Sequence, residues 1–117
     1  EGRYCGTLDE VKANVKRFGH IESCTFIEGW HENTLPLFKE KVAAVYIDVD
    51  LASSTRTCLK HLYPLLQPGG ICFSQDGHLP LVIEVFDDDN FWLNEVGCKK
   101  PHISGLGKKK LISIRKE

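Results

Sequence analysis

The sequence contains no methionine, and none of its hydrophobic runs is long enough to cross a bilayer. Its five cysteines are odd in number and have no C-x-x-C spacing, which argues against a zinc site or a dithiol redox site. We therefore interpret most of them as buried thiols in a reducing compartment. No signal-peptide pattern opens the chain, and no repeat or low-complexity tract interrupts it. These absences predict a cytoplasmic protein with no membrane partner.

The composition is that of an ordinary globular protein. The chain has 117 residues, of which 42% are hydrophobic and 26% charged, and this length fits one small domain. The formal net charge of −1 gives no general attraction for polyanions. Lysines 108–110, with lysines 99 and 100 nearby, could contact phosphate. Lysines beside an edge hairpin also discourage sheet-to-sheet association, and no aromatic residues alternate with these, so we expect no nucleic-acid partner.

The most informative segment is the apolar run that ends in Asp48-Val49-Asp50. In an extended strand, side chains two residues apart share a face, so Asp48 and Asp50 would point the same way. Two like charges this close require a metal ion, a hydrogen-bond network or a raised pKa. A solvated strand end with a turn-favouring aspartate would give the same tripeptide, and both interpretations stay open at this point.

A helix and a second strand are predicted next. Ser53-Ser54-Thr55 offer helix N-caps, leucines follow at helical spacing, and Gln67-Pro68-Gly69-Gly70 is expected to end the helix. The apolar run 71–75 then leads to Asp76-Gly77, where the glycine permits a tight turn.

This strand, helix and strand form a unit of an open α/β sheet. Ligands of such sheets bind outside the carboxyl ends of the strands, so we expect Asp48, Asp50 and Asp76 to converge on one rim. Among the five histidines, only His78 is expected at this rim, where a solvated turn residue is the simpler interpretation.

The whole chain alternates between helical and extended patterns. The predicted elements are a helix at 7–18, a strand at 24–28, a short helix at 35–39, a strand at 42–48, helices at 54–66 and 81–89, and strands at 71–75, 102–104 and 111–115. Thr7 and Glu10 fit a capping box for the first helix, whose buried stripe would be Leu8, Val11, Val15 and Phe18. The alternation predicts a parallel sheet with an antiparallel edge.

The segment KVAAVYIDVDLASSTRTCLKHLYPLLQPGGICFSQDG, residues 41–77, resembles the macrocin O-methyltransferase (TylF-like) family of class I S-adenosylmethionine-dependent methyltransferases. Residues 7–19, 25–30 and 34–36 are similar to the family's second helix and third strand, and 105–115 to its final hairpin. The resemblance implies S-adenosylmethionine as cofactor. It also implies methyl transfer to a hydroxyl of a sugar or another small molecule.

The resemblance implies a Rossmann-like class I methyltransferase sheet, mostly parallel with an antiparallel carboxyl-terminal hairpin. Residues 1–117 would then be a single partial domain without the first two strands and the glycine-rich cofactor turn. We interpret the chain as the carboxyl-terminal part of a methyltransferase, with a naturally shortened relative as the alternative. The missing strands would lie between 24–28 and 42–48. Either these two strands close up or a second chain fills the gap, and we expect a homodimer formed by strand or segment exchange.

The resemblance also assigns roles to individual residues. Family members hold a divalent metal, usually magnesium, with the residues matching Asp48, Gln75 and Asp76, and here Gln75 replaces an acid. Because this replacement removes one negative charge, a lower metal affinity is expected. Asp50 matches the family's proposed general base. The cofactor would contact Asp48 and the Gly29-Trp30 pair, although an indole at this place could equally belong to the core.

Two other functional classes remain open. A haloacid-dehalogenase-type phosphatase also has a strand ending in Asp-x-Asp, with Asp87-Asp88-Asp89 as its available later acids. A non-catalytic α/β interaction module would share the fold but bind no cofactor. The 117 residues alone are not expected to turn over substrate, because no glycine-rich cofactor turn is present.

Overall fold

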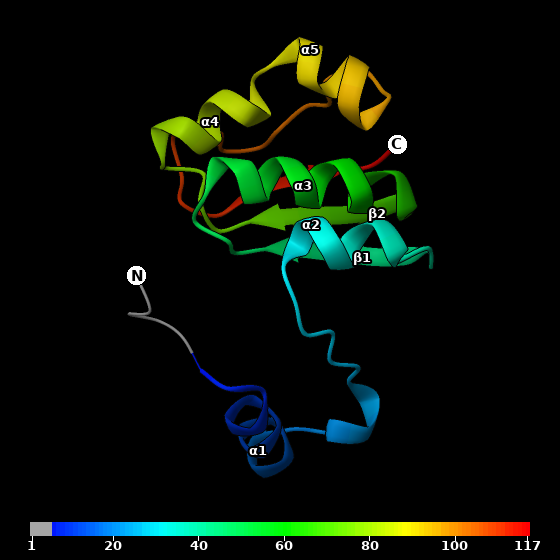
Figure 1. Cartoon of the computed structure of the whole chain (residues 1–117). Helices are drawn as coiled ribbons and strands as arrows, with labels where there is room; N and C mark the ends of the chain where they lie inside the picture. The colour runs from blue at the N-terminus through cyan, green and yellow to red at the C-terminus, as the bar shows by residue number, and fades with distance from the viewer. Residues whose placement is uncertain (1–5) are drawn as a thin grey trace.

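The computed structural model describes residues 6–117 as a mixed α/β structure built on a three-stranded sheet (Figure 1). Its elements in chain order are α1 (Leu8–Phe18), η1 (Ile21–Ser23), α2 (His31–Thr34), η2 (Leu35–Leu37), β1 (Val42–Ile47), α3 (Ala52–Leu62), η3 (Tyr63–Leu65), β2 (Leu66–Ser74), α4 (Pro80–Phe86), α5 (Asp89–Phe91), the π-helical turn η4 (Trp92–Val96) and β3 (Ile112–Arg115). Within this described part, no helix is long and apolar enough to cross a membrane.

The sheet has the order β1-β2-β3, with β1 parallel to β2 and β3 antiparallel to β2. The predicted parallel sheet with an antiparallel edge is therefore confirmed. The predicted strand at 102–104 is reduced to one bridge between Ser104 and Ser113. The helical stretch ends at Leu65, just before residues 67–70, as predicted, but these residues already belong to β2, which therefore begins earlier than the predicted strand at 71–75. Gly70 is required there, since a Cβ atom would lie 2.7 Å from the Ala43 carbonyl oxygen.

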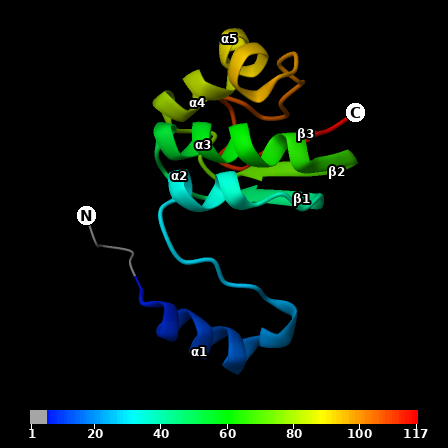
Figure 2. The ribbon, with the colours of Figure 1, turned by 45° about the vertical axis from the view of Figure 1, so that its right-hand side comes forward.

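The first helix forms as predicted, but it is not buried as predicted. The Thr7 hydroxyl oxygen accepts a hydrogen bond from the Glu10 amide at 3.1 Å, as an N-cap should. No residue of α1 is buried, and Phe18 is 77% exposed, so the predicted buried stripe is wrong. Figures 1 and 2 show α1 lying apart from the sheet, so its apolar side does not join the core of the described residues.

The predicted strand at 24–28 is also wrong. This stretch has no regular secondary structure and no hydrogen-bonded neighbour strand among the described residues, and a strand exists only through such pairing. The next helical turns begin earlier than predicted, with α2 at His31 and η2 ending at Leu37. The 24–28 stretch and β1 therefore do not close up against each other, which leaves the outer edge of β1 unpaired within the described chain.

The core lies on one side of the sheet, under α3, α4 and α5. The central buried side chains come from all three strands, from these helices and from η4, namely Val45, Ile47, Cys58, Leu59, Leu66, Cys72, Val82, Val85, Phe86, Phe91, Trp92, Ile112 and Ile114. Trp92 is fully buried, and its indole N–H donates to the Phe86 carbonyl at 2.9 Å. The predicted helix at 81–89 is split, because Asp88 starts a new helix at α5.

The other side of the sheet is open. Tyr46 is 60% exposed there and lies beside Phe73, with ring centroids 6.5 Å apart. No described helix packs on this face.

After the end of β3, the Lys116 ammonium donates to the Tyr63, Pro64 and Leu66 carbonyls at 3.0, 3.3 and 2.7 Å, which caps the end of η3.

The cysteines divide by burial. Cys58 and Cys72 are buried, Cys98 is half-buried and Cys24 is exposed, whereas Cys5 lies outside the described residues. The prediction of mostly buried thiols therefore holds for two of these four. Burial raises the pKa of Cys58 to about 11 and that of Cys72 to about 12. Since the thiolate is the nucleophile, both thiols are chemically protected in the folded chain.

Alkylation should discriminate among these thiols. With iodoacetamide near about pH 8, Cys24 is expected to react first, while Cys58 and Cys72 stay unmodified until the chain unfolds, because their pKa values lie far above that pH. Peptide mass spectrometry of native and urea-treated protein measures this. Equal labelling of Cys72 and Cys24 in the native sample would contradict the burial described above.

Candidate acidic site at the strand ends

Three carboxyl groups meet at the carboxyl ends of β1 and β2. Asp48 and Asp50 follow β1, Asp76 follows β2, and one carboxylate oxygen from each lies within 4.8 Å of the other two. Asp48 and Asp50 are exposed, whereas Asp76 is only 2% exposed. The three acids therefore lie together at one rim of the sheet, as expected. Parallel pairing explains it, since adjacent parallel strands end at the same edge of a sheet.

Asp50 reaches this cluster through a turn rather than through strand alternation. Strand β1 ends at Ile47, and Asp50 has a φ of 61°, in the left-handed region. The Leu51 amide donates to the Val49 carbonyl at 2.7 Å, which closes a three-residue turn, here called the Asp50 turn (Val49, Asp50 and Leu51). Such a conformation costs free energy for a residue with a side chain, and strained residues of this kind gather at functional sites.

Asp76 holds this turn. Its Oδ2 atom accepts hydrogen bonds from the backbone amides of Val49, at 3.3 Å, and Asp50, at 3.0 Å. The Asp76 amide itself donates to the Ser74 hydroxyl oxygen at 3.3 Å. Hydrogen bonds from backbone amides are what make a buried carboxylate tolerable.

The neighbouring charges act on Asp50. A hydrogen bond with the Asp76 side chain and repulsion from its charge raise the pKa of Asp50 above its usual range. The positive charge of Lys110, and that of His78 when it is protonated, oppose this shift, so both lie close enough to act on the site. His78 is exposed at the rim, as predicted, and shows no further contact that would give it a role.

Lys110 was not predicted at this site. The Gly77 amide donates to the Lys110 carbonyl at 2.8 Å. A Cβ atom at Gly77 would lie 2.8 Å from the Lys109 carbonyl oxygen and would collide with Ile112, so only glycine allows this close packing. The lysine-rich segment before β3 is thereby fixed beside the Asp76-Gly77 turn. Nothing in the spacing of these residues could have predicted it.

Gln75 carries an unsatisfied polar atom. Its amide donates to the Ile47 carbonyl at 3.0 Å, which ties the ends of β1 and β2 together. Its side-chain Oε1 is buried and has no hydrogen-bond partner among the described residues. A buried carbonyl oxygen without a partner costs about 1–3 kcal/mol.

The predicted cofactor residues Gly29 and Trp30 lie on the segment that leads into α2. Trp30 is 74% exposed, so the alternative of a core indole is wrong. Gly29 has a φ of 141°, and a Cβ atom there would lie 2.8 Å from the Thr34 methyl group. Both residues therefore shape an exposed entry into α2 rather than a strand end. Their contact with adenine stays a prediction.

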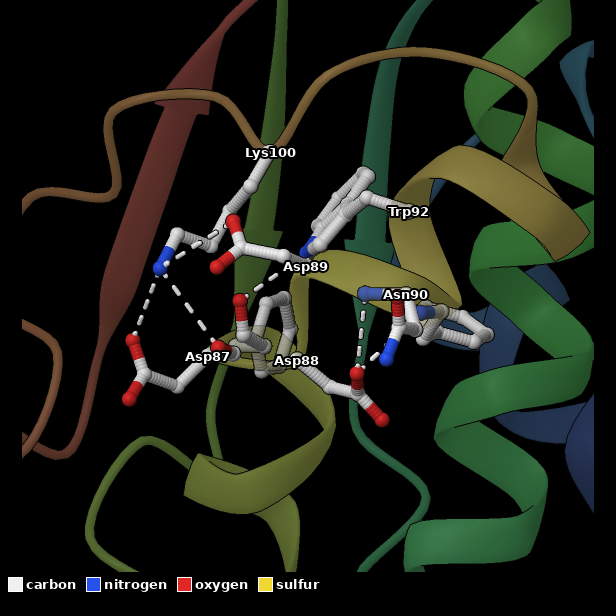
Figure 3. Close-up of polar contacts among 8 residues, drawn as sticks. Asp87, Asp88, Asp89, Asn90, Trp92 and Lys100 are labelled. Atoms are coloured by element: carbon white, nitrogen blue, oxygen red, sulfur yellow. Dashed lines mark hydrogen bonds and ion pairs between the residues drawn. The ribbon is translucent and has the colours of Figure 1, made fainter.

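The later acids needed by the phosphatase alternative have structural partners (Figure 3). Lys100 binds the carboxylates of Asp87, at 3.1 Å, and Asp89, at 3.6 Å. The Asp88 carboxylate caps α5 by accepting from the Asn90 and Phe91 amides. None of the three belongs to the cluster formed by Asp48, Asp50 and Asp76. The phosphatase interpretation thus loses its second acidic group.

The larger hollows of the described chain lie elsewhere. One of about 370 Å³ is lined by Tyr63, Cys98, Lys99, Lys100, Pro101, His102, Arg115, Lys116 and Glu117. A second, of about 340 Å³, is lined by Asp87, Lys100, Pro101, His102, Ile103 and Leu106. A smaller apolar one of about 210 Å³ lies between α2 and α3. None of these is lined by the three acids, which stand at an open rim.

Comparison with known proteins gives the family. The sequence profile of "Macrocin-O-methyltransferase (TylF)" matches residues 6–91, which is well over half of the chain and includes all three acids. The chain belongs to the macrocin O-methyltransferase (TylF) family. The resemblance seen in residues 41–77 is thereby confirmed.

Curated relatives agree with this family. The chain is 37% identical over 71 residues to the 8-demethyl-8-(2,3-dimethoxy-alpha-L-rhamnosyl)-tetracenomycin-C 4'-O-methyltransferase of Streptomyces olivaceus, covering 59% of this chain and 27% of that protein. It is 33% identical over 76 residues to the mycinamicin III 3''-O-methyltransferase of Micromonospora griseorubida, covering 63% and 30%. It is also 33% identical over 70 residues to the demethyldecarbamoylnovobiocin O-methyltransferase of Streptomyces niveus, covering 58% and 27%. The chain thus spans less than a third of the length of these relatives.

The strain of the Asp50 turn can be measured by substitution. Asp50→Gly is expected to be more stable than Asp50→Ala, by on the order of tenfold in the folding equilibrium constant, because glycine adopts a φ of 61° without a steric cost. Urea unfolding followed by circular dichroism compares the two variants, both of which lack the carboxylate. Equal urea midpoints would mean that the backbone at position 50 is not strained.

Proposed function

We propose that this protein is an S-adenosylmethionine-dependent O-methyltransferase that methylates a hydroxyl of a sugar or another small molecule, assisted by a divalent metal and with Asp50 as the base. The observation that supports it best is the cluster of Asp48, Asp50 and Asp76 within 4.8 Å at adjacent strand ends, in a member of the TylF family. The relatives are named as methyltransferases acting on tetracenomycin, mycinamicin and novobiocin compounds. A Rossmann-like class I sheet is the fold that we infer for the whole protein.

The residues present fit a magnesium ion. Carboxylate and amide oxygens are its preferred protein ligands, and Asp48, Asp76 and the unpaired Gln75 Oε1 offer these atoms at the ends of β1 and β2. When bound, magnesium would polarise the acceptor hydroxyl and lower its pKa. With Gln75 in place of an acid, the three proposed ligands carry two negative charges instead of three, so the affinity should be modest.

Asp50 is suited to take the acceptor's proton. Its carboxylate is exposed at the rim, and the Asp50 turn fixes its backbone. The pKa of Asp50 is raised by its hydrogen bond with Asp76 and by that group's charge, which makes it a stronger base than an ordinary aspartate. The hydroxyl oxygen would then attack the sulfonium methyl group, and the proton would pass to Asp50 as the new C–O bond forms and the S–C bond breaks.

Contacts to S-adenosylmethionine are proposed for Gly29, Trp30 and Asp48. The exposed indole of Trp30 offers a face on which adenine could stack. These contacts alone should give weak binding, because the described residues contain no glycine-rich cofactor turn. The non-catalytic interaction module stays the second candidate, and S-adenosylmethionine binding distinguishes the two.

Metal binding can be tested by isothermal titration with magnesium chloride. Asp48→Asn should weaken the magnesium affinity by on the order of tenfold, equivalent to about 1.4 kcal/mol, because it removes a ligand charge. Gln75→Asp should strengthen it for the opposite reason. Asp87→Asn is the matched control, since Asp87 pairs with Lys100 outside the cluster. An unchanged affinity in Asp48→Asn would remove Asp48 from the metal site.

The catalytic proposal requires an assay of methyl transfer. In a protein that carries this segment together with the rest of the family's length, Asp50→Asn should lower kcat by about 10²–10⁴-fold, the usual contribution of a general base. The assay uses S-adenosylmethionine, magnesium and glycosylated acceptors, and Asp87→Asn is again the control. Near-normal turnover by Asp50→Asn would exclude Asp50 as base without affecting the family assignment.

A second copy of this chain is the partner we propose, besides the small-molecule acceptor. The outer edge of β1 has no paired strand among residues 6–117, and no charged residue lies within Val42–Ile47. An uncharged open edge favours pairing with another strand. Two copies would associate either by pairing their β1 edges or by exchanging a segment.

Light scattering tests this partner against the monomer mass of 13.2 kDa. The Ile47 carbonyl accepts from the amide of Gln75, the residue after β2, so by strand alternation the Ala44 amide points to the open edge. Ala44→Pro should therefore shift a dimer to monomer without disturbing β2, whereas Ala44→Val should not, because valine keeps the amide. A monomeric parent chain would exclude edge pairing.

A further inference from the structure

The Asp50 turn needs support from outside itself. Its central residue has a φ of 61°, and the turn closes with one hydrogen bond, between the Leu51 amide and the Val49 carbonyl. A turn of this type is rare and costs free energy, so it persists only where the surroundings hold it in place. One side chain supplies this support.

That side chain is Asp76. Both remaining amides of the turn, those of Val49 and Asp50, donate to the same oxygen, Oδ2 of Asp76, at 3.3 and 3.0 Å. Hydrogen bonds to a carboxylate are stronger than those between neutral groups. The carboxylate is 2% exposed, so water competes little for it.

Asp76 is itself fixed. Its amide donates to the Ser74 hydroxyl oxygen, and its carbonyl accepts from the Leu79 amide at 3.0 Å. The next residue, Gly77, is packed against the backbone of Lys109 and Lys110. The acceptor that holds the turn is therefore anchored to β2 and to the segment before β3.

We propose that Asp76 is the positioning residue for Asp50, in addition to its proposed place among the metal ligands. Its Oδ2 fixes the backbone of the Asp50 turn, so the Asp50 carboxylate is in place before any cation binds. Its Oδ1 accepts from neither turn amide. The significance for catalysis rests on the proposed role of Asp50 as base, whereas the positioning itself does not.

Amide hydrogen exchange tests this positioning in the full 117-residue chain, labelled with ¹⁵N and ¹³C and kept in EDTA. In Asp76→Ala, the Val49 and Asp50 amides should exchange at least about tenfold faster relative to the Leu59 amide in the core, equivalent to losing about 1.4 kcal/mol of protection. Asp76→Asn keeps a neutral carbonyl acceptor and should fall between the parent and Asp76→Ala. Asp48→Ala is the matched control, because Asp48 accepts no bond from the turn, and it should leave both amides unchanged.

A second measurement needs no substitution. In the parent chain, a scalar coupling across the hydrogen bond should connect the Asp50 amide nitrogen to the Asp76 side-chain carbon, with or without magnesium. Absence of this coupling, or exchange in Asp76→Asn that matches the parent, would overturn the proposal even if Asp76→Ala does not fold. Protection that appears only after magnesium is added would also overturn it. Failure of magnesium to bind would instead count against the proposed function and leave these amide results standing.

Discussion

The parallel pairing of β1 with β2 is the constraint on which the site depends. It aligns Ile47 with Ser74, so the residues that follow each strand emerge at the same edge. The hydrogen bond from the Gln75 amide to the Ile47 carbonyl is the last contact of this pairing before the acids. A slip of one residue would turn Asp76 to the opposite side of the sheet, away from Asp50. Gly70 helps to fix the register, because no side chain fits against Ala43.

The same edge also determines where α3 begins. After the Asp50 turn, the chain enters the helix directly at Ala52, with Leu51 at its N-cap and no side chain capping it. The Thr55 hydroxyl, predicted as a cap, instead donates to the Leu51 carbonyl at 2.8 Å from inside the first turn. The start of α3 therefore follows from a tertiary contact and not from local capping preference. This contact is the pair of hydrogen bonds that Asp76 accepts from the amides of the preceding turn.

Local patterns predicted those parts of the fold that depend on neighbouring residues. The strand 42–48, the helix after it and the acid at the end of 71–75 follow from periodicity, and together they implied the meeting of Asp48, Asp50 and Asp76. The parts that failed depend on partners distant in sequence. Residues 24–28 have the composition of a strand but no strand to pair with, and the apolar stripe of α1 does not join the core of the described chain.

Other features had no signal at all in the sequence. The positive φ of Asp50 belongs to a residue that is not glycine, and the carboxylate that accepts from its amide is 26 residues away. The position of Lys110 beside the acids depends on how closely Gly77 packs against its backbone. Contacts of this kind are products of the assembled structure, and only coordinates reveal them.

The contrasting positions of the two tryptophans give this protein two separate optical reporters. Trp92 is fully enclosed beside Tyr63 and Phe91, so its fluorescence emission should be blue-shifted and shielded from a quencher such as acrylamide. Trp30 is mostly in water, on the segment where adenine is proposed to stack. Loss of the blue component therefore reports the integrity of the core. A change confined to the quenchable component reports events at Trp30 alone, so unfolding and ligand binding can be followed separately in one sample without an added label.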